Sequence, residues 1–255
     1  MLGYMHARHA LILAAVLPLL AVAGCGDDDE DAAGSSGSSQ LAVSAAASLQ
    51  EALTQCAPDA KLQFAGSDEL AAQIRQDAPV DVLAAANTKI PDELAGEGKL
   101  EEPVEFASNQ LVLAVPADSD IQGLDDLEGS GLKLVIGAEG VPVGDYTRTV
   151  LGNLPPEQGE AILANVRSEE PDVKGVVGKL TQGAADAGFV YATDVKAAGE
   201  DLRAIELPAD LEPVATYGAG VVAASEHKDD AQTFVDGLVD GACHDALLET
   251  GFGEP

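Results

Sequence analysis

The feature that most constrains the fold of this chain is the alternation of short apolar runs with helix-like stretches from residue 41 onward. The runs are continuously apolar, which is typical of strands buried on both faces of a sheet. Strand and helix in alternation predict an α/β fold with largely parallel sheets. The expected strands are residues 41–47, 61–64, 80–86, 111–115, 133–137, 187–191, 202–207 and 214–224. The expected helices are residues 48–55, 67–76, 91–98, 143–151, 156–165, 172–182, 229–239 and 242–249.

These elements divide into two sets, which predicts two lobes. Residues 41–112 together with 219–255 form the first expected lobe, and residues 113–218 form the second. Two extended strands, at residues 111–115 and 216–224, are expected to cross between the lobes. Two lobes joined by two strands make a hinged clamp, with a ligand-binding cleft between them.

The first 24 residues have the pattern of a bacterial export signal. A basic start is followed by an apolar run at residues 11–20, which is too short for a comfortable membrane span. The run ends in small residues before Cys25, and this arrangement resembles a lipoprotein processing site. We therefore expect residues 1–24 to be removed and Cys25 to be acylated, which anchors an extracytoplasmic protein to the cell membrane. The alternative is an ordinary signal peptide followed by a chance cysteine.

Residues 25–40 follow as an acidic stretch and then a Gly/Ser stretch, which predicts a flexible tether. The whole chain is acidic, with 44 Asp and Glu against 13 Lys and Arg and a formal net charge of −31. Such a surface repels nucleic acid and offers no basic stripe to bind it. It does not exclude an anion that is held by local dipoles.

The three cysteines fit one lipid anchor and one disulfide. If Cys25 is acylated, Cys56 and Cys243 remain as an even pair in an oxidising compartment, which favours a bond between them. That bond would tie the first helix of the domain to the last. Two unpaired buried thiols are the alternative.

Two serines stand where an expected strand passes into an expected helix. Ser48 follows three alanines, and with Glu51 it has the spacing of a capping box. Ser67 follows Ala65 and Gly66 in a similar turn. A plain N-cap would explain each serine alone. Such turns, however, lie at the carboxyl edge of an α/β sheet, where helix N-termini can bind an anion. A serine hydroxyl there can accept from an N–H group and still donate its proton to an oxyanion.

The second lobe offers further uncharged donors. Residues 140–146 contain two glycines and Pro142 and begin one expected helix, and residues 171–174 begin another. Both helix starts would supply backbone N–H groups. Tyr191 stands at the carboxyl end of an expected strand, although this position is equally typical of an ordinary half-buried tyrosine.

Six sequence pieces occur in a fixed order along the domain. They are AAASL, FAGS-x-x-L, APVDV-x-x-AA, VPVGDY, PDV-K and GFVYATD. Their order and spacing resemble the periplasmic molybdate-binding proteins of ABC importers, over nearly all of residues 41–252. The resemblance implies the two-lobed periplasmic-binding-protein fold of type II, with a mostly parallel sheet flanked by helices in each lobe. It also implies a monomer without a cofactor, which captures molybdate or tungstate for an ABC permease and ATPase.

The resemblance further implies a site made of uncharged donors. Two serine hydroxyls, two backbone N–H groups and one tyrosine hydroxyl would hold the oxygens of the dianion, and molybdenum would be present only as molybdate. The corresponding positions here are Ser48, Ser67, Val143, Val173 and Tyr191. Fixed donors must replace the hydration shell of the ion, and they impose a cavity size. Such a cage should reject the smaller sulfate and hardly separate molybdate from tungstate.

Three acidic residues, Glu51, Asp68 and Glu69, lie in the first helical turns beside these serines. A carboxylate that faced the site would repel a dianion. We therefore expect all three to point to solvent.

Other functions find less support in the sequence. An enzyme is not expected, because only His227 and His244 follow the signal segment and neither serine lies in a G-x-S-x-G elbow. No metal-ligand spacing, phosphate loop or dinucleotide fingerprint occurs. Iron-binding relatives use clustered tyrosines, whereas Tyr146, Tyr191 and Tyr217 are spread along this chain. The open alternatives are the same fold with sulfate, phosphate or a small organic anion, and a sensory lipoprotein without a transport role.

Overall fold

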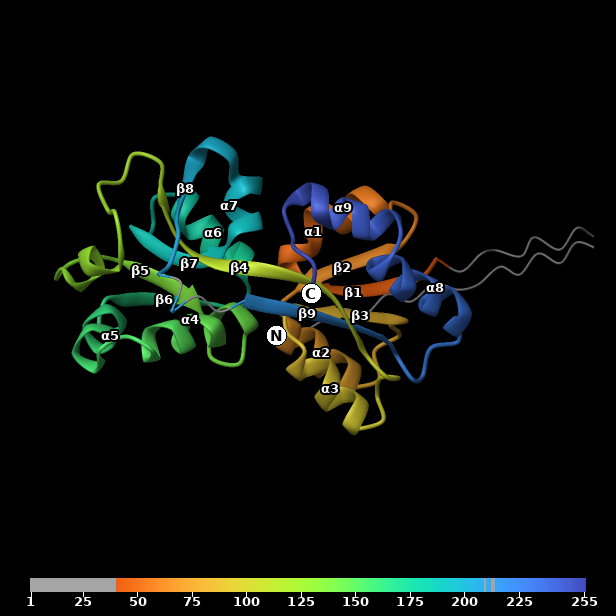
Figure 1. Cartoon of the computed structure of the whole chain (residues 1–255). Coiled ribbons are helices and arrows are strands. Elements are labelled where there is room, and N and C mark those ends of the chain that lie inside the picture. Colours follow the sequence, from red (N-terminus) through yellow and green to blue (C-terminus); the bar gives the residue numbers. More distant parts are fainter. Residues whose placement is uncertain (1–39, 209, 212–213) are drawn as a thin grey trace, which may run out of the picture. The chain divides into compact units, whose positions relative to one another are not determined.

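The computed structural model describes residues 40–208, 210–211 and 214–255, and Figure 1 shows their arrangement. The expected alternation of strands and helices is present. The strands are β1 (Ala42–Ala46), β2 (Lys61–Ala65), β3 (Val82–Ala85), β4 (Val104–Pro116), β5 (Leu134–Gly137), β6 (Val166–Glu170), β7 (Ala187–Tyr191), β8 (Leu202–Ile205) and β9 (Val214–Val221). The α-helices are α1 (Gln50–Cys56), α2 (Ser67–Arg75), α3 (Lys89–Gly96), α4 (Pro142–Gly152), α5 (Pro156–Leu163), α6 (Val173–Thr181), α7 (Ala192–Ala198), α8 (Lys228–Val239) and α9 (Ala242–Thr250). The short 3-10 helices are η1 (Ala47–Leu49), η2 (Leu124–Glu128) and η3 (Gly199–Asp201).

Two blocks of parallel strands form the framework. In the first block β1 pairs in parallel with β2 and β3, and in the second β5 pairs in parallel with β6 and β7. Helices cover both faces of each block (Figure 1): α1 and α9 lie opposite α2 and α3, and α6 and α7 lie opposite α4 and α5. Burial on both faces explains why most of these strands are continuous apolar runs.

The long strand β4 joins the two blocks (Figure 1). Its residues up to Gln110 pair antiparallel with β9, and those from Leu111 onward pair antiparallel with β7 and β8. Strand β9 also pairs antiparallel with β3. The sheet order is therefore β2-β1-β3-β9-β4-β7-β5-β6, with β8 beside β4. Parallel pairing holds inside the two blocks, and the strands that join them are antiparallel.

The chain is thus an α/β protein of two halves, as the sequence predicts. Strand β4 changes partners between Gln110 and Leu111, close to the expected boundary after residue 112. The exact lobe boundaries, at residues 112 and 218, stay a prediction.

Buried apolar side chains hold both halves together. The larger cluster extends from Leu53 in the first half through Leu111 to Phe189 in the second. The smaller cluster contains Leu70 and Leu83 and fills the space between α2, α3 and the neighbouring strands. The first half carries one further link, a disulfide between Cys56 at the end of α1 and Cys243 in α9.

Among the strands and α-helices, three differ most from the sequence expectation. Strand β4 begins at Val104 rather than at residue 111. Its first part was not predicted, because polar residues such as Ser108 and Asn109 interrupt the apolar pattern. Strand β6 was not expected, because VRSEE is polar; it lies at the end of the sheet order, where none of its residues is fully buried. Helix α7 was not expected, because it follows β7 without an intervening Gly or Pro turn.

The expected signal segment 1–24, the lipid-modified Cys25 and the tether up to residue 39 lie outside the described residues. Within the part of the chain that is described, no helix combines the length and the apolar character needed to cross a membrane.

Candidate functional site

The five expected site positions come from turns at the carboxyl ends of parallel strands. Ser48 lies in η1 directly after β1, and Ser67 begins α2 after the neighbouring strand β2. Val143 and Val173 lie in the first turns of α4 and α6, which follow the parallel strands β5 and β6. Tyr191 ends β7, the other parallel neighbour of β5. Parallel strands bring such turns to one edge of a sheet, which is where α/β proteins bind ligands.

Ser48 does not cap a helix, so the expected capping box with Glu51 is wrong. The helical segment already begins in η1, with Ala46 at its N-cap position and no capping side chain. The hydroxyl oxygen of Ser48 lies 2.9 Å from that of Tyr217. Glu51 instead accepts a hydrogen bond from Lys174. Ser48 is therefore held by a long-range contact and not by its own helix.

Ser67 also serves a purpose other than capping. Helix α2 has Gly66 at its N-cap position, and no side chain caps it. The Ser67 Oγ accepts a hydrogen bond from the backbone N–H of Ala86 at 3.0 Å. Because the oxygen accepts there, the hydroxyl proton remains available for another acceptor. Ser67 thus has the arrangement that a donor to an oxyanion requires.

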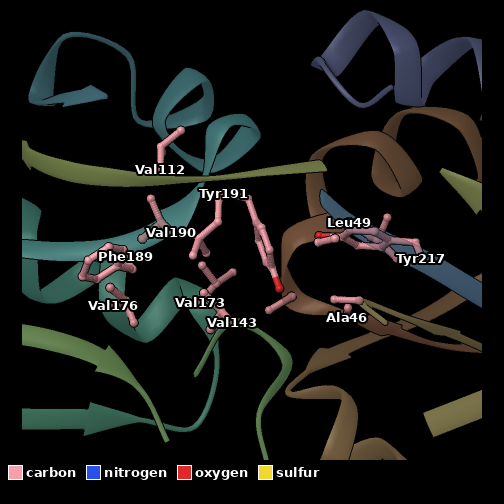
Figure 2. Close-up of a cluster of buried hydrophobic side chains, with 14 of the residues drawn as sticks. Ala46, Leu49, Val112, Val143, Val173, Val176, Phe189, Val190, Tyr191 and Tyr217 are labelled. Carbon is pink, nitrogen blue, oxygen red and sulfur yellow. The ribbon is translucent and has the colours of Figure 1, made fainter. Parts of the chain in front are cut away.

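Val143 and Val173 can contribute backbone N–H groups. Helix α4 begins at Pro142, and α6 begins after Asp172, whose Oδ1 accepts from the N–H of Gly175 at 2.8 Å. The first N–H groups of a helix have no acceptor inside the helix and carry a fractional positive charge. Figure 2 shows the two valine side chains close together on the side of Tyr191 away from Tyr217.

Tyr191 presents a buried hydroxyl that lacks a partner. Its side chain extends from β7 toward the segment around Ala46 (Figure 2) and is 1% exposed. Its hydroxyl makes no hydrogen bond with any other described residue. An unpaired buried hydroxyl costs about 1–3 kcal/mol, so its presence points to a ligand or water as partner. Burial raises the pKa of Tyr191 well above its usual value, so the phenol keeps its proton and can donate it.

One small cavity brings all five positions together. We call it the central pocket, which is lined by Ser48, Ser67, Val143, Val173 and Tyr191. The other lining residues are small or apolar, with one acid: Ala46, Ala47, Ala65, Gly66, Ala86, Val141, Pro142 and Asp172. The cavity volume is about 20 Å³, which suits a compact ligand and not an extended organic one. Of the described residues that line it, none is Lys or Arg.

The two halves of the protein meet beside the central pocket. A Cβ atom on Gly66 would lie 2.3 Å from the carbonyl oxygen of Pro171, so only glycine allows this approach. Lys174 adds an ion pair across the halves, with its Nζ 2.9 Å from Glu51, and within its own half it lies 3.2 Å from the buried Asp194. The pocket therefore lies directly beside contacts between the two halves.

The acidic residues near the serines behave in two ways. Glu51 and Glu69 are exposed, as expected. Asp68 differs, because its Oδ1 is buried without a hydrogen-bond partner among the described residues and lies close to Gly66. The expectation that all three carboxylates point to solvent is wrong for Asp68.

Two residues that the sequence analysis did not select lie behind Ser48. Tyr217 of β9 is fully buried, and its ring centroid lies 6.0 Å from that of Tyr191, so these two tyrosines are clustered and not spread out. Asn109 of β4 lies within 3.5 Å of the Tyr217 hydroxyl. A polar side chain inside a buried strand, such as Asn109, needs a hydrogen-bond partner. This requirement is the sequence signal that could have indicated a buried hydrogen-bond network here.

Lys174 and Asp194 form a charged pair whose pKa values respond to burial. Burial raises the pKa of Asp194 to about 6, although Lys174 opposes this shift. Burial also lowers the pKa of Lys174, but the charges of Asp194 and Glu51 outweigh it, so the pKa of Lys174 is raised. The lysine therefore stays charged at neutral pH.

Comparison with known proteins gives a consistent result. Residues 35–253 match the model of a family described as bacterial extracellular solute-binding protein. The molybdate-binding protein ModA of Mycobacterium tuberculosis H37Rv is 33% identical over 231 residues, which cover 86% of each chain. ModA of Haemophilus influenzae is 28% identical over 233 residues, which cover 84% of this chain and 90% of that protein.

Among solved structures, the periplasmic molybdate-binding protein of Azotobacter vinelandii matches with a TM-score of 0.75 and 21% identity. The match covers 85% of this chain and 100% of that chain. At this level of identity the likeness concerns the fold, which is the two-lobed type II architecture of periplasmic binding proteins.

Proposed function

Because the chain belongs to the family of bacterial extracellular solute-binding proteins, we propose that it captures molybdate in the central pocket and delivers it to an ABC importer. The observation that carries this proposal is the convergence of two serine hydroxyls, two helix starts and the unpartnered Tyr191 hydroxyl on one small cavity. The relatives named as molybdate-binding proteins supply the identity of the ion.

Uncharged donors suit a tetrahedral dianion for physical reasons. The ion is strongly hydrated, and binding must replace that water with hydrogen bonds of fixed geometry. Backbone N–H groups and short hydroxyls lose little conformational entropy when they bind, in contrast to long Lys or Arg side chains. Their fixed positions also select an ion by size. Molybdate and tungstate are nearly equal in size, so we propose that tungstate binds as well.

The binding-competent state would be the enclosed one. Donors on both halves reach the ion only when the halves meet, so the ion favours closure. We propose that the importer, which consists of permease and ATPase subunits, then recognises the closed monomer.

We propose that Cys25 is acylated and that residues 25–40 tether the binding domain to the outer face of the cell membrane. A Cys25→Ala variant should then be released from the membrane fraction into the soluble fraction. Its retention with membranes would contradict the anchor.

The proposal includes no catalytic step. The two histidines of the described chain contact residues remote from the central pocket: His227 lies 3.1 Å from Asp81, and His244 lies 3.4 Å from Glu254. Neither lines the pocket beside Ser48 or Ser67. A serine nucleophile there would lack a histidine base.

Calorimetry of the purified domain with molybdate, tungstate, sulfate and phosphate tests the proposed ligand. We expect tight binding of molybdate and tungstate and no detectable binding of sulfate or phosphate. Tighter binding of sulfate or phosphate than of molybdate would replace the proposed ligand with that anion. Binding of none of the four would reject an oxyanion role.

The serine hydroxyls provide the matching test of the site. Ser48→Ala and Ser67→Ala should each weaken molybdate binding by about 1–3 kcal/mol, the usual loss for a hydrogen bond to a charged group. Thermal unfolding should confirm that both variants are folded. Unchanged affinity in both variants would reject this site.

A further inference from the structure

We infer that Tyr217 and Asn109 fix the direction of the Ser48 hydroxyl, so that Ser48 donates its proton into the central pocket. Tyr217 is thus a positioning residue, which acts on the ligand only through Ser48. The inference rests on the proposed function for the identity of the ligand, but its geometric part stands on the hydrogen bonds behind Ser48.

Asn109 is the first residue of the hydrogen-bond network, and its side-chain orientation is fixed by its neighbour Gln110. The backbone N–H of Gln110 points at the amide oxygen Oδ1 of Asn109 at 2.9 Å. A backbone N–H can only donate, so this atom must be the oxygen and the other must be the NH₂ group. The Nδ2 atom lies 2.8 Å from Thr193 Oγ1 and 3.5 Å from the Tyr217 hydroxyl. Asn109 therefore donates to both hydroxyl oxygens.

The direction of the hydrogen bond between Tyr217 and Ser48 follows from which acceptors are available to the proton of each hydroxyl. The Tyr217 oxygen accepts from Asn109, and among the described residues its other well-formed hydrogen bond is with the Ser48 oxygen, at 2.9 Å. If Tyr217 donates to Ser48, both of its hydrogen-bonding roles are fulfilled. If Ser48 donated to Tyr217, the buried phenol proton could turn only toward the neighbouring Tyr191 hydroxyl, with which Tyr217 forms no well-aligned hydrogen bond, and that is costly.

The position and protonation of Tyr217 suit such a role. Its ring is packed edge-on against Phe106, at a centroid distance of 6.1 Å, and against Phe252, at 5.3 Å. This packing holds the hydroxyl in place without the help of Ser48. Burial raises the pKa of Tyr217, so the phenol keeps the proton that it donates.

The consequence for the ligand site is specific. Once the Ser48 oxygen accepts from Tyr217, the serine has one proton left, and Ser48 lines the central pocket. Ser67 is arranged in the same way, because its oxygen accepts from Ala86. Both serine hydroxyls would then already point into the pocket as donors before an anion binds. Binding would therefore not carry the cost of reorienting them.

The binding test is a double-mutant cycle with molybdate as the probe. Tyr217→Phe keeps the ring and should weaken binding about tenfold, because Ser48 loses its preset direction. In the Ser48→Ala background, Tyr217→Phe should cause no further loss, because the partner through which it acts is absent. Thr233→Val is the control, because it removes a hydroxyl that donates to Asp229 in α8 and does not line the central pocket, and it should bind like the wild type.

Two outcomes of this cycle overturn the inference. One is wild-type affinity of Tyr217→Phe. The other is a loss in the double variant equal to the product of the two single losses, which would mean that Tyr217 acts independently of Ser48. Thermal unfolding of each variant separates these outcomes from a failure to fold.

Neutron diffraction from deuterium-exchanged crystals decides the geometry without any ligand. A deuteron on Tyr217 that points at the Ser48 oxygen supports the inference, and a deuteron on Ser48 that points at Tyr217 overturns it. If the wild-type protein failed to bind molybdate, the proposed function would be wrong, while this map would still settle the direction of the Ser48 hydroxyl.

Discussion

At the scale of single residues, Asp194 shows how a buried charge is retained next to the central pocket. Its side chain is 1% exposed, and one of its oxygens accepts a hydrogen bond from the backbone N–H of Tyr191 at 3.3 Å. The other oxygen lies 3.2 Å from Lys174. Asp194 thus holds the start of α7, and with it the backbone of the residue whose hydroxyl faces the pocket. The burial of its carboxylate is only partly offset by these two contacts.

The pKa of Asp194 predicts a pH dependence of stability. Burial raises this pKa from 3.8 to about 6 in the folded protein, so the folded state binds a proton more tightly than the unfolded state. The stabilisation from this proton is complete below about pH 4 and is lost as the pH rises toward 6. Relative to Asp194→Asn, the wild-type protein should lose up to about 3 kcal/mol of unfolding free energy over this interval and change little above it.

Urea unfolding of both proteins between pH 4 and pH 8 measures this difference. Groups that titrate alike in the two proteins cancel in the comparison. A difference in unfolding free energy that stays constant across the interval would show that Asp194 does not titrate there.

At the scale of elements, the disulfide connects the segment that carries Ser48 to the end of the chain. Helix α1 continues directly from η1, and its last residue, Cys56, is bonded to Cys243 in α9. The two cysteines are separated by 187 residues. Closing so long a loop restricts the unfolded chain, whereas the contact between Ser48 and Tyr217 acts inside the folded protein.

We therefore expect that the disulfide mainly supports stability and only weakly affects binding. Replacement of both cysteines by serine should lower the free energy of unfolding by about 2–4 kcal/mol. Molybdate affinity should change by less than about tenfold, because Tyr217 still holds Ser48. Urea unfolding with and without a reductant measures the effect, and the double variant, which cannot respond to the reductant, is the control. Equal stability of the reduced and oxidised wild type would contradict the expected role.

At the scale of the whole described domain, closure depends on how closely the two halves can approach. Gly66 touches the backbone of Pro171, and Lys174 pairs with Glu51 across the same region. The ion pair is partly exposed and contributes little by itself. The backbone contact is stricter, because a carbonyl oxygen cannot move aside like a flexible side chain.

Gly66→Ala should hold the two halves apart and weaken molybdate binding by at least about tenfold, because donors on opposite halves no longer reach one ion together. Calorimetry measures the loss. The matched control is Gly96→Ala, because a Cβ atom there would meet nothing within 4 Å. An unchanged affinity of Gly66→Ala would show that closure tolerates the added methyl group.

The sequence by itself determined the features that depend on neighbouring residues. Apolar periodicity and turn chemistry are local, so they predicted most strands and helices and placed Ser48, Ser67, Val143, Val173 and Tyr191 at the ends of strands or the starts of helices. The parallel strands then brought these five positions to one pocket. Strand β6 and helix α7 were not predicted, because an edge strand can be polar and a helix can begin without a turn signal.

Only the tertiary structure decided which hydrogen-bond and ion-pair partners the side chains near the site contact. Ser48 was expected to cap its own helix, but its hydroxyl faces Tyr217, 169 positions further along the chain. Glu51, the other half of the expected capping box, pairs with Lys174 over 123 positions. Local sequence carries no information about contacts at such separations, because they depend on how the sheet brings β1, β4 and β9 together. The physical reason is that buried polar groups take their partners from whatever element packs against them.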